Sequence, residues 1–248
     1  MRDARDWVAH LEAHLPLALS GEDPEGVHQV RVAGRRLRAY LELLGHRILR
    51  DDLRFLVRQA GRVRDLEVAL GWALPQGVRG QLEAELKEAR EALSGLLLSP
   101  WMGALLRSLR HLPPLDKGQA RKRLKRLQER LEARFLELRA EPSLERLHAY
   151  RRALRRVRYA KEFLGLPARR ERALQEVLGE FNDLEVLWRL LVAYVQSRRD
   201  EETTPFMREV EGMRLLAFSR ALEELGLRLP PRPGPRGEAP SVPGSRGM

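Results

Sequence analysis

The strongest constraint on the fold of this 248-residue chain is an internal repeat. Residues 28–45 and 148–165 lie 120 positions apart and are identical at nine of eighteen positions. A second block, residues 61–68, aligns with residues 179–186 at an offset of 118, and both contain Asp-Leu-Glu-Val. Two blocks in the same order at nearly the same spacing indicate a duplicated unit. The chain is therefore expected to contain two similar halves.

Both halves have the composition and spacing of α-helices. Leu, Ala, Arg and Glu, all strong helix formers, dominate the chain. Apolar residues recur three or four positions apart, as at Leu124, Leu127 and Leu131, and strand-like alternation is absent. Short breaks at prolines predict about eight antiparallel helices, four on each side of Pro113 and Pro114. We therefore predict an all-α fold of two four-helix units.

Composition divides the chain into a helical body, residues 1–229, and a tail, residues 230–248. We expect the first helical half to span residues 1–112 and the second to span residues 116–229. The tail is rich in Pro and Gly and has almost no apolar side chains. Such a segment cannot offset the entropy of ordering, so we expect the tail to be flexible.

Arginine dominates the charge of the chain. Lys and Arg together number 46 against 35 Asp and Glu, which gives a formal net charge of +11, and only five of the 46 are lysine. Guanidinium groups bind phosphate and carboxylate groups bidentately. A partner rich in one of these groups is therefore expected.

The repeated segment places its basic residues on one face of a helix, because each helical residue turns by about 100°. In the first copy, a face about 80° wide contains His28, Arg31, Arg35, Arg38 and Glu42. In the second copy, the corresponding face contains His148, Arg151, Arg155, Arg158 and Glu162, with Tyr159 beside them. The opposite face of the first copy is apolar.

Such a face is either ordinary solvated surface or a binding surface. Solvated helix faces usually mix charges of both signs. Neighbouring like charges about 6 Å apart repel by roughly 1 kcal/mol in water and by more near a protein surface. A nearly uniform row of cations is therefore costly unless an anion meets it, and its presence in both halves favours binding.

The pattern His-x-x-Arg-x-x-x-Arg-Arg-x-Arg, found twice in a basic helical chain, resembles the CHAD domain, the conserved histidine α-helical domain. The Asp-Leu-Glu-Val blocks fit the segment that follows each motif in that family. The resemblance covers about residues 1–227 and implies two four-helix bundles related by a pseudo-twofold axis. It also implies a basic surface or channel between them that binds inorganic polyphosphate. Position by position, it assigns binding to His28, Arg31, Arg35, Arg36 and Arg38, and to His148, Arg151, Arg155, Arg156 and Arg158.

Two positions depart from the usual pattern of that family. Gly34 stands where the family more often has a larger residue. Glycine in the middle of a helix costs about 1 kcal/mol of helix propensity, but it permits close packing. Arg155 stands where the family often has lysine, which keeps the charge and adds bidentate capacity.

Further charged residues have two interpretations each. Arg121 and Lys125 share a helix face, and either extend the phosphate surface or are simply solvated. Asp65 and Asp183 lie in the Asp-Leu-Glu-Val blocks. In the functional interpretation, they orient an arginine or hold a cation at the phosphates. In the structural interpretation, they cap helices or form salt bridges. For these two aspartates the structural interpretation is favoured.

Three functions are weighed for the chain. We favour non-catalytic binding of polyphosphate or another phosphate-rich polyanion, with no cofactor and no metal site. Nucleic-acid binding is the alternative, although the aromatic platforms that bind single strands are not evident. A phosphohydrolase is less favoured, because the sequence has no paired carboxylate cluster and no P-loop glycines.

Composition and histidine chemistry give two further expectations. The absence of cysteine, of long apolar runs and of a signal-like N-terminus predicts a cytoplasmic protein with no membrane partner, with polyphosphate granules as a second expected location. Histidines titrate near pH 6.5, so His28 and His148 predict tighter polyanion binding below that pH.

Overall fold

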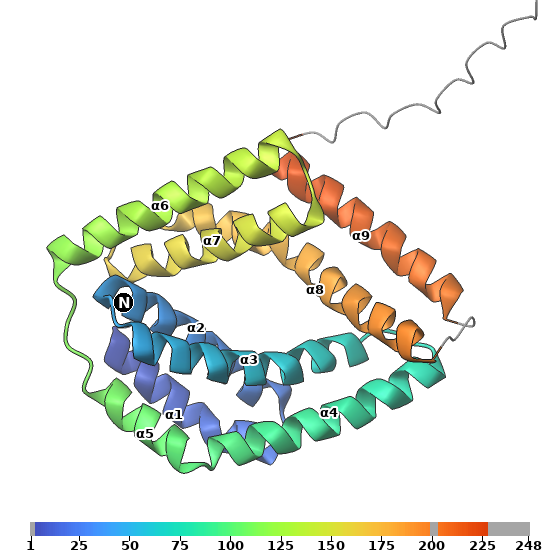
Figure 1. Ribbon diagram of the computed structural model, residues 1–248, viewed down its shortest axis with the longest axis horizontal. Helices are drawn as coiled ribbons and strands as arrows, with labels where there is room; N and C mark the ends of the chain where they lie inside the picture. Colours follow the sequence, from blue (N-terminus) through green and yellow to red (C-terminus); the bar gives the residue numbers. More distant parts are fainter. Residues whose placement is uncertain (1–2, 199–202, 228–248) are drawn as a thin grey trace, which may run out of the picture.

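The fold is helical throughout the residues that the computed structural model describes, 3–198 and 203–227. Within these ranges there are nine α-helices and no strand (Figure 1). In chain order they are α1 (Ala4–Ser20), α2 (Pro24–Leu44), α3 (Arg47–Leu70), α4 (Gln76–Leu97), α5 (Pro100–Arg110), α6 (Lys117–Ala140), α7 (Leu144–Phe163), α8 (Arg169–Arg198) and α9 (Thr204–Glu224). The predicted all-α class is confirmed, and the predicted tail lies outside the described residues.

The first half contains one helix more than the four expected, because a new helix starts at Pro100. The hydroxyl of Ser99 accepts a hydrogen bond from the Met102 amide at 3.3 Å, and Pro100 occupies the first turn. Serine at the N-cap followed by proline is a strong start signal. Taken singly, no described helix is long and apolar enough to span a membrane, and only α4 and α5 together, bent by 58°, meet that test.

The ends of α2 follow the local signals in the sequence. The Asp23 carboxylate accepts a hydrogen bond from the Glu25 amide at 2.8 Å, and Pro24 begins the helix. Gly45 ends the helix with a φ of 80°, and its amide donates to the Leu41 carbonyl at 2.8 Å. Glycine adopts this left-handed conformation without the steric cost of a Cβ atom.

The two helices that carry the repeated motif, α2 and α7, come together in the interior of the molecule (Figure 1). Each is the second helix of its half, and the helix that follows it, α3 or α8, carries Asp-Leu-Glu-Val. Across the halves, α2 contacts α6 and α7, and α3 contacts α8. The motif and the Asp-Leu-Glu-Val block thus fall on the second and third helix of each half, whereas the duplication itself remains a prediction.

The hydrophobic core is shared between the two halves. The largest cluster joins side chains of α1 to α5 with Leu187 and Leu191 of α8 and Val210 of α9. A third cluster joins Leu43 of α2 to Val157 of α7 and to apolar side chains of α6. Because apolar burial is the main favourable term in folding, the halves stabilise each other.

Glycines set the close approach of α2 to its neighbours. A Cβ atom on Gly26 would lie 2.5 Å from the backbone nitrogen of Ala18 in α1. A Cβ atom on Gly34 would lie 2.6 Å from Cγ2 of Val57 in α3. The predicted close packing at Gly34 is therefore confirmed, and α2 fits tightly between α1 and α3.

We predict that Gly26→Ala lowers the free energy of unfolding by about 1–3 kcal/mol, because the new methyl group overlaps the α1 backbone. The matched control is Gly80→Ala in α4, where the added methyl group would have no neighbouring atom within 4 Å. There we expect a gain of about 0.5–1 kcal/mol from helix propensity. Urea unfolding followed by circular dichroism measures both, and equal effects would contradict the packing argument.

Candidate functional site

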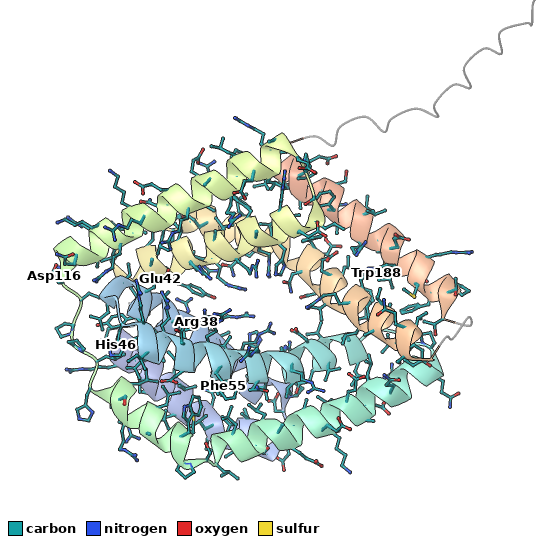
Figure 2. All side chains as sticks on the ribbon, viewed as in Figure 1. Arg38, Glu42, His46, Phe55, Asp116 and Trp188 are labelled. Carbon is teal, nitrogen blue, oxygen red and sulfur yellow. The ribbon has the colours of Figure 1, made fainter. Side chains whose placement is uncertain are left out.

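Arginines from four helices surround a cavity of about 440 Å³ that we call the basic cavity. It lies between α2, α3, α6 and α7, and Figure 2 shows Arg38 and Glu42 in this region. Eight arginines, two carboxylates and one tyrosine account for its polar lining: Arg35, Arg38, Arg50, Arg54, Arg130, Arg152, Arg155, Arg156, Glu42, Asp51 and Tyr159. The cavity is therefore strongly cationic.

Arg35 of α2 and Arg155 of α7 are the most perturbed arginines of the cavity. Burial lowers the pKa of Arg35 well below its usual value, and the charges of Arg155 and Arg31 lower it further. Burial and the charge of Arg151 lower the pKa of Arg155 to about 10, so it remains a cation at neutral pH. Neither guanidinium forms an ion pair or a hydrogen bond with another described residue. Two repelling cations thus lie half-buried without an internal counterion.

Arg38 and Arg156 extend the cationic lining away from this pair. Burial lowers the pKa of Arg38, and the charges of Arg156 and Arg54 act in the same direction. Arg156 is exposed at the cavity. The structure therefore brings together four of the arginines that the motif predicts.

Arg31 and Arg151 lie at the other end of the motif rows and are tied to the Asp-Leu-Glu-Val blocks. Arg31 forms a 3.1 Å ion pair with Asp65 and lines a neighbouring cavity of about 410 Å³. Arg151 donates a hydrogen bond to Oδ1 of Asn182 at 2.7 Å. Asp65 thus forms a salt bridge, and because its partner is a motif arginine, the contact fits both the structural interpretation and the orienting one. In the second half the hydrogen-bond acceptor is Asn182, the residue before Asp183.

Arg36 and Arg158 are held by Glu162 rather than directed into the basic cavity. Arg36 pairs with Glu162 across the two halves, and Arg158 pairs with it at 3.0 Å. The Arg36 guanidinium lies 4.4 Å from the Trp7 ring centroid and 4.5 Å from that of Tyr159. Although burial opposes it, the Arg36 and Arg158 contacts lower the pKa of Glu162. Arg36 therefore joins the halves through Glu162, whereas the Arg158 pair lies within α7.

Tyr159 lines the basic cavity, but only 6% of it is exposed. The Arg36 and Arg158 guanidinium groups pack against its ring, so little of the ring is available to a ligand in the cavity. That Tyr159 contributes to polyphosphate binding stays a prediction.

The two motif histidines are half-buried and are not among the residues that line the basic cavity. Burial lowers the pKa of His28, with Glu25 opposing and neighbouring arginines adding to the decrease. Burial and the charges of Arg152 and Arg151 lower the pKa of His148 to about 4. Both pKa values thus lie below the ordinary histidine value on which the predicted pH dependence of binding is based, and that dependence stays a prediction.

Arg121 and Lys125 are exposed on α6 and are not among the residues of the basic cavity. Arg130 of the same helix lines it instead, nine residues and therefore about 180° around the helix from Arg121. Arg123 donates a hydrogen bond to the Leu43 carbonyl at 2.7 Å and packs against Gly45 at the end of α2. The structure thus does not join Arg121 and Lys125 to the motif arginines.

Four cavity arginines lie outside the residues that the sequence predicts: Arg50, Arg54, Arg130 and Arg152. A signal for two of them exists, because α3 has arginines at every fourth position, namely Arg50, Arg54, Arg58 and Arg62. The first two line the basic cavity and the last two line the neighbouring one. In the part of the chain that the structure describes, no three His, Asp or Glu side chains are grouped to hold a metal ion.

We predict that His148→Gln flattens the pH dependence of stability between about pH 6.5 and pH 4. An unfolded histidine titrates near pH 6.5, whereas His148 in the fold has a pKa of about 4. In that window the unfolded chain binds more protons, so the free energy of unfolding falls as the pH falls. Urea unfolding at several pH values measures the slope. The exposed His111→Gln is the control, and an unchanged slope in His148→Gln would contradict the assignment.

Comparison with known proteins agrees with this architecture. The family model of the CHAD domain matches residues 3–192. The CHAD domain structure from the plant Ricinus communis is 26% identical, with 86% of this chain and 83% of that chain covered and a TM-score of 0.69. PptA from Streptomyces chartreusis, 18% identical with 89% and 96% covered and a TM-score of 0.67, shares the fold. No curated protein matches. Because the family model spans well over half of its residues, the chain belongs to the CHAD domain family.

Proposed function

We propose that the protein binds inorganic polyphosphate in the basic cavity without catalysing its conversion. The observation that carries this proposal is the pair Arg35 and Arg155, two half-buried cations from the two halves with no described counterion. Burying unpaired charge is costly, so an external anion that meets both is strongly favoured.

The shape of the cationic lining supports a linear polyanion. From Arg35 to Glu42 the α2 part of the lining covers seven residues, or about 10 Å of helix, and α7 contributes Arg155 and Arg156 from a second helix. A chain of phosphates has charge at every unit and can meet donors along this length. Each charge-assisted hydrogen bond contributes about 1.5–3 kcal/mol.

Nucleic acid is a poorer fit to the same lining. The aromatic side chains near the cavity, Tyr159 and Trp7, lie against the Arg36 guanidinium and are more than nine-tenths buried. Among the described residues, these two rings beside the cavity therefore offer bases no exposed face on which to stack, and stacking is the usual source of single-strand affinity. Binding through backbone phosphates alone leaves the bases without partners.

The polar lining also supports a binding role over a hydrolytic one. Eight of its charged groups are guanidinium ions, which donate hydrogen bonds and cannot accept a proton near neutral pH. Of the two carboxylates, Glu42 already faces Arg50 and Arg130. Release of phosphate from polyphosphate in the presence of Mg²⁺ would contradict this part of the proposal.

We predict that Arg35→Gln combined with Arg155→Gln weakens binding of long-chain polyphosphate by about 100-fold. Each arginine contributes at least about 1.4 kcal/mol, and that energy is tenfold in affinity. Isothermal titration calorimetry measures the change. Arg121→Gln combined with Lys125→Gln removes the same charge outside the cavity and is expected to keep affinity within about twofold. Equal losses in the two double variants would show that bulk charge alone binds the polyanion.

We also predict that duplex DNA and single-stranded RNA, at matched phosphate concentration, do not displace bound polyphosphate. The basic cavity, about 440 Å³ between four helices, is too small to enclose a duplex, and the rings beside it are too buried for single-strand bases to stack on. Fluorescence anisotropy of labelled polyphosphate reports displacement at fixed salt, because affinities of polyanions depend steeply on salt. Displacement by either nucleic acid at equal concentration would favour nucleic-acid binding.

A further inference from the structure

Two glutamates occupy matching positions in the repeated segments but have different surroundings. Glu162 of α7 is contacted by three arginines: Arg36, Arg158 at 3.0 Å and Arg172 at 3.3 Å. It lies outside the basic cavity and lines a separate cavity beside Trp7. Glu162 is therefore fully engaged by arginines, one from the first half and two from its own half.

Glu42 of α2 lies inside the basic cavity and is held loosely. Its Oε1 is 4.0 Å from Nη1 of Arg50 and 3.7 Å from Nη1 of Arg130, both near the outer limit of an ion pair. The side chain is only 15% exposed, and its charge also raises the pKa of Arg38 against the burial of that arginine. Glu42 thus occupies, among arginines of α2, α3 and α6, a place that suits an external anion.

The position of Glu42 along α2 sets which ligands it meets. The row runs from Arg31 through Arg35 and Arg38 to Glu42, one turn before the helix ends at Gly45. No described carboxylate forms an ion pair with Arg35 or Arg155. The positive potential is therefore least cancelled at these two arginines. An anion confined to that pair stays clear of Glu42, whereas a chain that extends along α2 past Arg38 reaches the Glu42 carboxylate.

We infer that Glu42 is a displaceable internal anion that weakens the binding of long phosphate chains relative to short ones. This inference rests on the proposed function, because it concerns how the same cavity selects among polyphosphates. A long chain has to separate Glu42 from Arg50 and Arg130 and then lies beside a like charge. A short chain at Arg35 and Arg155 avoids both costs. Asp51, the other carboxylate of the cavity, is exposed and has no described ion pair, so water screens it.

The test is Glu42→Gln, measured by titration calorimetry against tripolyphosphate and against long-chain polyphosphate at one salt concentration. Glu88→Gln is the matched control, because Glu88 is exposed on α4 and its loss changes the net charge equally. We expect long-chain affinity to rise by at least about fivefold in Glu42→Gln, the effect of removing one like charge, and tripolyphosphate affinity to change by less than about twofold. Glu88→Gln should leave both affinities within about twofold.

Each other outcome decides against a particular claim. An unchanged long-chain affinity in Glu42→Gln, or an equal rise for both ligands, overturns the role of Glu42 while the cavity still binds polyphosphate. Failure of the unmodified protein to bind either ligand overturns the proposed function itself. Glu162→Gln gives a second comparison, because it should lower the melting temperature without raising the affinity for long-chain polyphosphate. A higher long-chain affinity in Glu162→Gln would show that the weak ion pairs of Glu42 do not set its effect on binding.

Discussion

The repulsion between Arg35 and Arg155 is the constraint on which the rest of this structure depends. Two helices that carry like charges toward each other separate unless other contacts hold them. Here the holding contacts lie around the pair: Glu162 with Arg36 on one side, and the apolar cluster of Leu43 and Val157 on another. Folding therefore supplies the energy that keeps a cationic cavity open to an anion.

The arginines of one motif take different roles according to their nearest acceptor. Arg31 is paired with a carboxylate of the following helix, and Arg36 is paired with a carboxylate of the other half. Arg35, between them in the sequence, has neither. An ion pair offsets part of the desolvation cost of a buried arginine, so the paired arginines serve structure, whereas the unpaired one lacks that compensation and is left to bind. The division follows from the placement of a few acidic side chains, not from the arginine pattern itself.

Much of the fold and part of the site could be predicted from the sequence, because both follow from local rules. Helical periodicity places Arg35 and Arg38 on one face of α2 and Leu37 in the core, and the structure agrees. Arg36 and Arg156 hold the same place in the motif, yet only Arg156 reaches the basic cavity. That difference depends on where Glu162 lies in space, which no spacing within one helix reveals.

The cavity arginines of α3 and α6 could not be predicted for a related reason. The four-residue spacing of Arg50 and Arg54 shows that they share a face, but which neighbour that face meets depends on the packing of α3. The start of α5, in contrast, could be predicted from the sequence. Ser99 and Pro100 are an ordinary local signal for the start of a helix, which the prediction of eight helices does not use.

The contact between Arg123 and the end of α2 has a consequence for how the chain is divided. A helix terminus exposes carbonyl groups that need donors, and the Leu43 carbonyl obtains one from α6, beyond the proline-rich connection. At Gly45 any side chain would meet the Arg123 guanidinium, since a Cβ atom there would lie 2.5 Å from Nη2. The second half thus completes the secondary structure of the first. A cut between residues 112 and 116 would separate the end of α2 from the donor that Arg123 supplies, so the two halves depend on each other and are not modules joined by a linker.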